Sequence, residues 1–445
     1  MPAHIVSSED VRTAALRPIL GGGLRFWVIA GMLTALVIPG VVAYVTQLRS
    51  GLGVTGLSDD VFWGVYTANL VAFIGISYGG AVVSAVLRLT DAHWRAPITR
   101  MAEAMALISL MIGASFAVIH VGRPTRLWEM ATSPNFSSPL VWDMIAISTY
   151  LAATAVLLYL PLIPDLAIAR ERLGSRAGGW RLAIYRLLSA RWRGLPRQRR
   201  LLNWGMDGVA LLIIPLAVAV HSVLAWAFGL TSRAGWHSSV LGPYFVVAAL
   251  LSGVATVILV IAAFRKAYHL EQFIEERHFR YLASLMLALG VAYLYLTIAE
   301  LLTEGYVLNE ESAPALEALL LDRFAPLFWL FVVVGGAIPT LLVSLPWTRT
   351  IPGIVIAATL AVAGMWLKRI LIVVPPLSQH VFEAESVAYR PSMVEALVTL
   401  SAAAAIPLLL MLFFRVFPVL SISEMEDVAE ESDRAAFAAA TNPGS

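Results

Sequence analysis

The hydrophobic positions of this chain fall into ten long runs that are separated by shorter polar segments. Each run is mostly apolar and about 20 residues or longer, which is the length that an α-helix needs to cross the hydrocarbon core of a bilayer. We therefore predict ten membrane-spanning helices. Their expected ranges are 25–48, 62–88, 99–121, 141–163, 205–230, 240–265, 280–303, 323–345, 351–372 and 392–417.

Three segments outside these runs are polar. Residues 1–24 are expected to lie at the cytoplasmic interface, and residues 418–445, which are acidic and then rich in Ala, Asn, Pro and Gly, are expected to be a disordered cytoplasmic tail. Segment 164–204 holds ten arginines and only two acids, Asp165 and Glu171. We interpret it as a basic cytoplasmic loop that either fixes the topology or docks anionic lipid or a partner.

Lysine and arginine are distributed unevenly between the two predicted sides, which sets the orientation. If the N-terminus is cytoplasmic, 23 of the 31 basic residues lie on the cytoplasmic side. The remaining eight are Arg49, Arg123, Arg126, Arg233, Arg323, Lys368, Arg369 and Arg390. We therefore predict a multi-pass protein of the bacterial inner membrane with both termini in the cytoplasm.

The composition supports this assignment. Of 445 residues, 59% are hydrophobic and 13% are charged, and the mean hydropathy is +0.79, so the length is spent on spans rather than on soluble domains. The absence of cysteine excludes a disulfide, an Fe–S cluster and covalently attached haem. We expect no metal site and no nucleic-acid partner. The N-terminus lacks the pattern of a cleaved signal peptide, so the first span is expected to stay.

A short repeat would suit a grouping of the spans into two bundles; alternatively, this likeness of three residues arises by chance. His93-Trp94-Arg95 precedes the third span and His278-Phe279-Arg280 opens the seventh, so both stand where an outward-going helix begins. The predicted fold class is an all-α integral membrane protein with two four-helix bundles and flanking helices. Its expected parts are 25–61 (first span and periplasmic loop), 62–230 (first bundle), 231–390 (second bundle) and 391–417 (last span).

Two candidate catalytic residues flank one loop. The third span ends at His120 and the fourth begins beside Asp143. Helices joined by a short loop are antiparallel neighbours, so we expect both residues at the periplasmic face. Histidine exchanges protons near neutral pH, and a nearby carboxylate can orient its ring. The pair suits a molecule that gives up protons together with electrons, of which quinol is the obvious example; alternatively, both are ordinary interfacial residues.

Other ionisable residues in the spans are candidates because a charge in the membrane is costly. Glu103 and Asp207 lie near the cytoplasmic ends of their spans, and Glu300, Lys368 and Arg369 lie near periplasmic ends. Adjacent helical residues point about 100° apart. We therefore expect one of Lys368 and Arg369 to point into the bundle and the other to reach the interface.

Two other functions compete with a quinol site. Haem would need two histidines that face each other, and His120 with His221 is an imaginable pair. The remaining candidates lie in predicted loops: His93, His237, His269, His278 and His380. A secondary transporter would hold its binding residues near the midplane, whereas the best polar pair here lies at one face.

The sequence resembles the NrfD/PsrC-like family, the integral membrane subunits of polysulfide-reductase-type complexes, and more closely the quinol-oxidising membrane subunits of alternative complex III. The resemblance covers nearly all of residues 60–390. It is carried by Arg95–Met105 (RAPITRMAEAM), Ile119–Pro124 (IHVGRP), Ser138–Tyr150 (SPLVWDMIAISTY), Gly235–Tyr244 (GWHSSVLGPY) and Gly364–Val374 (GMWLKRILIVV).

The resemblance implies a site for quinol or menaquinol at the periplasmic end of the first bundle. His120 and Asp143 match the family's histidine and aspartate, and Arg369 matches the arginine of its ninth-span motif. We also assign Arg123 and Trp142, which lie in the same stretch, to quinol binding. The family holds no haem or Fe–S cluster in this subunit. Electrons are expected to pass to a periplasmic Fe–S subunit, ferredoxin-like or of the molybdopterin type, in a complex with other membrane subunits, lipid and quinone.

A proton path is also implied, as is proposed for the family. Tyr78 and Glu103 lie in adjacent spans toward the cytoplasmic side, Asp207 can join them, and Glu300 is a further candidate. Alternatively, Glu103 only reaches the inner surface and Tyr78 only packs. This chain departs from the family at Tyr78, where a histidine is expected, at Lys368, where an acid is usual, and in a shorter loop after His120.

The leading prediction is a quinol-binding membrane subunit of a respiratory oxidoreductase, which is not catalytic alone. The alternatives are a membrane anchor of a quinol-linked molybdopterin or sulfur-compound reductase of the same family, a secondary transporter, and a structural subunit without a site.

Overall fold

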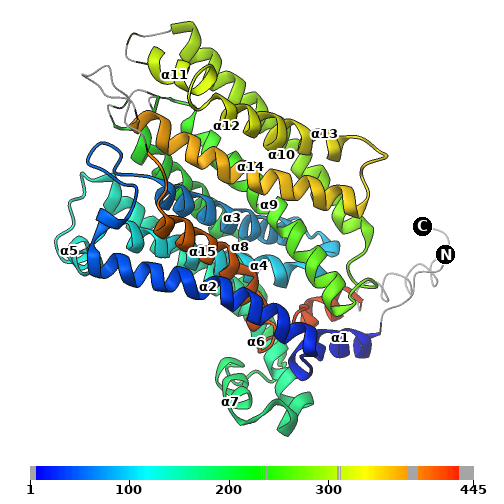
Figure 1. Cartoon of the computed structure of the whole chain (residues 1–445). Coiled ribbons are helices and arrows are strands. Elements are labelled where there is room, and N and C mark those ends of the chain that lie inside the picture. The colour runs from blue at the N-terminus through cyan, green and yellow to red at the C-terminus, as the bar shows by residue number, and fades with distance from the viewer. Residues whose placement is uncertain are drawn as a thin grey trace.

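The computed structural model describes residues 7–231, 233, 235–236, 238–307, 310, 312–378 and 389–429. Every regular element in these ranges is a helix, and ten helical segments are long and apolar enough to cross a membrane, which confirms the predicted fold class. They run side by side (Figure 1). They are α2 (Leu24–Ser50), α3 (Val65–Leu89), α4 (Ala96–His120), α6 (Pro139–Leu173), α8 (Pro196–Gly229), α9 (Leu241–Tyr268), α10 (Glu276–Val307), the composite α12 (Ala325–Leu330)–η5 (Phe331–Ala337)–α13 (Ile338–Ser344), α14 (Ile351–Leu377) and α15 (Met393–Phe413).

Shorter helices connect the spans. They are α1 (Ser8–Leu20), η1 (Leu52–Val54), η2 (His93–Arg95), η3 (Pro124–Arg126), α5 (Leu127–Thr132), η4 (Gly174–Ala177), α7 (Gly179–Leu188) and α11 (Ala313–Leu320). Five of the spans, α4, α6, α8, the composite that begins with α12, and α14, carry a proline in their first turn. Proline fits there because the first amides of a helix have no partner within it. The loop prolines of the sequence therefore mark where the spans begin.

The spans form two four-helix bundles, as predicted. The first contains α3, α4, α6 and α8, and the second contains α9, α10, α12–η5–α13 and α14, while α2 and α15 pack together beside the first bundle. Helix α3 lies at the centre and also contacts α9, α14 and α15. We name the two ends of the bundles the His120 end and the Arg95 end after residues that lie there.

A pair of glycines brings the two bundles together. A Cβ atom on Gly79 of α3 would lie 2.3 Å from the Cα of Gly253 on α9, and the reverse distance is 2.2 Å. No side chain fits at either position, so the two helix backbones touch directly. The π-helical segment η5 makes the same kind of contact within the second bundle, where Gly335 meets Gly364 of α14.

The Arg95 end is more ordered than the sequence suggests. Much of the expected loop 164–204 is helical, because α6 continues to Leu173 and α7 follows. The expected disordered tail begins inside a packed segment: Val419, Leu420 and Ile422 are fully buried, and residues 422–429 are helical. Disorder from residue 418 is therefore wrong for residues 418–429, whose apolar side chains join the core. Residues 430–445, and the loop histidines His237 and His380, lie outside the described ranges.

Candidate functional site

His120 and Asp143 lie at the same end of the first bundle. His120 is the last residue of α4, and Asp143 lies in the second turn of α6. The Nδ1 atom of His120 is 3.0 Å from the carbonyl oxygen of Phe116. Because a carbonyl only accepts, Nδ1 carries the proton and Nε2 remains an acceptor. In the described structure no hydrogen bond or ion pair joins the two residues, and Oδ1 of Asp143 is buried without a partner.

A residue that the sequence analysis did not single out holds this end of α4 in place. The buried side chain of Gln47, on the flanking helix α2, donates from Nε2 to the carbonyl oxygen of Ile119 at 2.9 Å. Its Oε1 accepts a hydrogen bond of 2.7 Å from the hydroxyl of Tyr66 on α3. Gln47 thus links three helices next to His120. The sequence feature that could have identified Gln47 is its polar amide within the otherwise apolar first span.

Arg123 and Trp142 lie at the surface of the same end. Arg123 follows Gly122, whose φ of +73° makes the turn after α4, and its side chain is exposed. Trp142 is also exposed, and its Nε1 donates to the carbonyl oxygen of Phe136 at 2.9 Å. Both residues are close to the pair in sequence, but the structure gives neither one a polar contact with His120 or Asp143 within the described residues.

Arg369 and Lys368 are both buried, so the expectation that one of them reaches the interface is wrong. Arg369 donates from Nη1 to the carbonyl oxygen of Met365 at 2.7 Å and from Nη2 to Oγ of Ser252 on α9 at 3.2 Å. Its Nη2 also packs against Gly75 of α3, so Arg369 fills the junction of the two bundles rather than the His120 end.

Lys368 turns the other way, into the second bundle. Its Nζ lies 3.6 Å from Oε2 of Glu300 on α10 and 5.2 Å from the ring centre of Tyr244. The rings of Phe328 and Phe331 also face it. A carboxylate and three aromatic faces stabilise the ammonium in place of water, which is why the lysine need not extend to the interface.

The remaining candidates for proton transfer lie at different depths. The buried Glu103 accepts a hydrogen bond of 2.9 Å from Ser84 on α3, and its Oε2 has no partner. Tyr78 is buried, with its ring 4.7 Å from that of His221 on α8. Asp207 is exposed at the Arg95 end, where its Oδ1 accepts from Nε of Arg88 at 2.8 Å. Glu300 belongs to the second bundle and is separate from these three.

The first bundle contains a group of buried polar atoms that lack a protein partner. They come from all four of its helices, and among the described residues they are Asp143 Oδ1, Glu103 Oε2, His221 Nε2 and the hydroxyls of Thr67 and Ser109. The hydroxyls of Ser77, Tyr150 and Thr154 lie close together and have only one another as partners. Buried polar groups are normally satisfied by protein or by ordered water. This interior therefore suits bound water between the two ends. The described residues include no group of three His, Cys, Asp or Glu side chains that could hold a metal ion.

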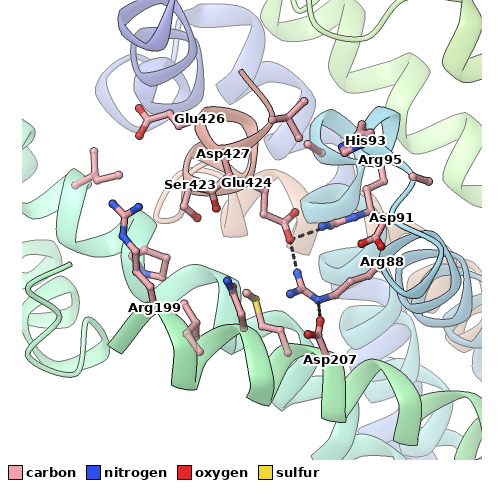
Figure 2. A pocket seen from close by; sticks show the side chains of 18 of the residues that line it. Arg88, Asp91, His93, Arg95, Arg199, Asp207, Ser423, Glu424, Glu426 and Asp427 are labelled. Atoms are coloured by element: carbon pink, nitrogen blue, oxygen red, sulfur yellow. Dashed lines mark hydrogen bonds and ion pairs between the residues drawn. The ribbon is translucent and has the colours of Figure 1, made fainter. Parts of the chain in front are cut away.

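A cavity of about 880 Å³ opens at the Arg95 end, away from His120 (Figure 2). Arg88 stands between two acids in it, Asp207 and Glu424, and Glu424 also binds Arg95 at 2.8 Å. Arg199 of α8 lines the opposite wall. Acids and arginines alternate around the space, which makes it a polar, water-accessible vestibule rather than an apolar pocket for a quinone ring.

Comparison with known proteins places these features in a family. Residues 53–380 match the model of the family described as "Polysulphide reductase, NrfD". A putative dimethyl sulfoxide reductase membrane subunit of Halobacterium salinarum is 32% identical over 82% of this chain and 80% of its own length. An Hdr-like menaquinol oxidoreductase integral membrane subunit of Archaeoglobus fulgidus is 24% identical over 93% and 99%. A selenate reductase subunit of Mesobacillus selenatarsenatis is 26% identical over 81% and 84%.

Proposed function

Because this chain belongs to the NrfD polysulphide reductase family, we propose that it is the quinol-binding membrane subunit of an oxidoreductase complex. Three relatives that match most of its length are named as subunits of reductases or of a menaquinol oxidoreductase, two of them as membrane subunits. The observation that carries the proposal is the buried, partnerless Oδ1 of Asp143 at the same bundle end as His120.

The proposed reaction uses His120 and Asp143 as proton acceptors. Oxidation of a quinol to a quinone releases two protons and two electrons. His120 accepts one hydroxyl proton at Nε2, and the Asp143 carboxylate accepts the other. The apolar helix surfaces beside them hold the ring and the isoprenoid tail. Gln47 keeps the last turn of α4, and with it the His120 ring, in position. The name of the archaeal menaquinol oxidoreductase makes menaquinol the first substrate to test.

The electrons leave the chain to a separate redox subunit. The sequence has no cysteine, and we propose that this subunit holds neither haem nor an Fe–S cluster. A partner of the ferredoxin-like or molybdopterin type would dock at the His120 end and receive them. A reductase of a sulfur or selenium compound, as the relatives' names suggest, and alternative complex III both fit this scheme.

We further propose that the His120 end faces the periplasm of a bacterial inner membrane and that both termini are cytoplasmic. The charge distribution supports this, because segment 164–204, with its ten arginines, lies at the Arg95 end. The cavity there would then open to the cytoplasm. Protons could pass from Asp207 at its wall to Glu103 and, through water beside Tyr78, toward the site. In the second bundle, Glu300 with Lys368 is a second candidate for proton transfer.

The test is to replace the two acceptors in the assembled complex. His120→Ala and Asp143→Asn should each lower quinol-dependent reduction of the acceptor by about a hundredfold or more, the usual contribution of one general acid or base. Glu129→Gln, an exposed acid at the same end, is the matched control and should keep normal turnover. Full activity in both site variants, with normal assembly, would refute the site.

A further inference from the structure

Helix α7 (Gly179–Leu188) is held firmly against the Arg95 end by one of its faces. The buried Tyr185 donates its hydroxyl proton to the carbonyl oxygen of Val416 at 2.6 Å, and burial raises the pKa of Tyr185 to about 12, so it remains a donor. Arg181 donates to the carbonyl oxygen of Ile19 at 3.1 Å. Tyr159 of α6 donates to that of Leu188 at 3.1 Å. The opposite face of α7 therefore points in a fixed direction.

That opposite face is apolar and exposed. Trp180, Ala183 and Leu187 are spaced three and four residues apart, which places them on one stripe. Trp180 is 57% exposed and Leu187 is 77% exposed. On the first turns of α8, Leu201 and Trp204 are also exposed, at 60% and 77%. Figure 1 shows α7 near the end of α6, projecting from the rest of the molecule.

Unneutralised positive charge surrounds this stripe. Six arginine side chains of the segment are exposed, lie outside the cavity of Figure 2, and have no hydrogen bond or ion pair in the part of the chain that the structure describes: Arg176, Arg186, Arg191, Arg193, Arg197 and Arg200. The two acids of the segment do not offset them. Asp165 is fully buried against Arg100, and Glu171 lies 3.7 Å from Arg170.

We propose that these side chains form a binding surface for anionic phospholipids of the leaflet at the Arg95 end. We call it the α7 surface: Trp180, Leu187, Leu201, Trp204 and these six arginines. The arginines bind the phosphodiester groups, and the tryptophan and leucine side chains enter the boundary between headgroups and acyl chains.

The combination of features favours lipid over a soluble partner. An acidic protein would satisfy the arginines but would leave the exposed tryptophan and leucine side chains of α7 and α8 to be covered separately. A membrane leaflet offers both an anionic headgroup layer and an apolar acyl-chain layer next to it. The arginines of α7 and α8 match the first layer, and the exposed tryptophan and leucine side chains match the second. The proposal does not depend on which face of the membrane is cytoplasmic, nor on the quinol site.

The absence of cysteine allows a clean first test on the full chain. Leu187→Cys, labelled with a polarity-sensitive dye, is placed in nanodiscs of phosphatidylcholine with phosphatidylglycerol that carry a nitroxide on the lipid chain. Immersion at the interface should quench the dye at least about twofold. Glu271→Cys, exposed in the turn between α9 and α10 at the same end, is the control and should be quenched far less. A Leu187 label that reports bulk water would overturn the proposal and point to a protein partner.

A second test addresses headgroup charge. The detergent-purified chain is titrated with phosphatidylglycerol, phosphatidylcholine or inorganic phosphate, and the bound lipid is counted by native mass spectrometry. The triple variant Arg186→Gln, Arg191→Gln, Arg193→Gln should retain about tenfold less phosphatidylglycerol than the unmodified chain. The double variant Arg277→Gln, Arg280→Gln, whose arginines are already paired with Glu275 and Glu276, should retain a normal amount. Equal retention of phosphatidylcholine, an unaffected triple variant, or displacement of the lipid by inorganic phosphate would each overturn the proposal.

Discussion

Arg100 of α4 and Asp165 of α6 form an ion pair of 2.7 Å in which neither side chain is exposed. Arg100 also donates to the carbonyl oxygens of Leu158 and Pro161. Asp165 accepts from the backbone amides of Ile422 and Ser423 at 3.2 and 2.9 Å, at the start of the C-terminal helical turns. One carboxylate thus connects the interior of the first bundle to the segment that closes its Arg95 end.

Loss of this carboxylate should destabilise the chain. Asp165→Asn leaves the guanidinium of Arg100 buried without a counter-charge, which costs about 3–5 kcal/mol for a buried pair. The midpoint of thermal unfolding in detergent measures the effect. Glu171→Gln, which changes the other acid of the segment but at an exposed position, should leave the midpoint unchanged. Equal midpoints for both variants would show that the pair contributes nothing.

Lys368 and Glu300, the ion pair of the second bundle, should behave as a coupled unit. Lys368→Met leaves Glu300 without its counter-charge, and Glu300→Gln does the same to Lys368. The double variant leaves neither charge unpaired. The two single changes should therefore destabilise by more, in sum, than the double change, with a coupling energy of about 0.5–3 kcal/mol. A double-mutant cycle on unfolding midpoints tests this, and strictly additive effects would contradict it.

Proton movement should depend on Glu103. Glu103→Gln removes the only buried carboxylate of α4 and keeps the hydrogen bond to Ser84 possible. The complex in liposomes should continue to oxidise quinol while proton translocation falls, because the amide cannot carry a proton. The exposed Glu271→Gln is the control. An unchanged ratio of protons to electrons, or a complex that moves no protons at all, would refute the path.

The orientation can be checked with single cysteines, since the chain has none of its own. Asn135→Cys, in the loop after α5 at the His120 end, should react with an impermeant maleimide added to spheroplasts. Glu271→Cys at the opposite end should react only after the membrane is opened. The reverse pattern would overturn the assignment of the His120 end to the periplasm.

The spans were predictable because each is a single uninterrupted apolar run, and the shared end of His120 and Asp143 follows from the antiparallel order of α4 and α6. The extent of α6 was not predictable. Pro161, Pro164 and Asp165 look like the start of a loop, but the helix continues through them. The aspartate is tolerated there because Arg100, 65 positions earlier, reaches it. Sequence spacing carries no signal for a contact of that kind.

The same reason explains the error at Lys368 and Arg369. The two side chains were correctly expected to point in different directions from α14. The sequence did not reveal that each direction offers buried partners: Glu300 and aromatic rings for Lys368, and Ser252 for Arg369. Gln47 shows the converse case: its polar side chain in an apolar run marked a contact, yet only the fold identifies Ile119 and Tyr66 as the groups it holds.

The hydrogen bond from the amide of Ile422 to Asp165 joins residues 257 positions apart in the chain. This separation determines when the contact can form during synthesis. By the time the ribosome has made residue 422, all ten spans have been synthesised, and α4 and α6 have long since left the translocon. During that interval Asp165 has Arg100 as a partner but lacks the two backbone amides of Ile422 and Ser423. Closure of that end therefore cannot precede the synthesis of residue 422. A chain that terminates before Val419 would be inserted in full and would still remain unsealed.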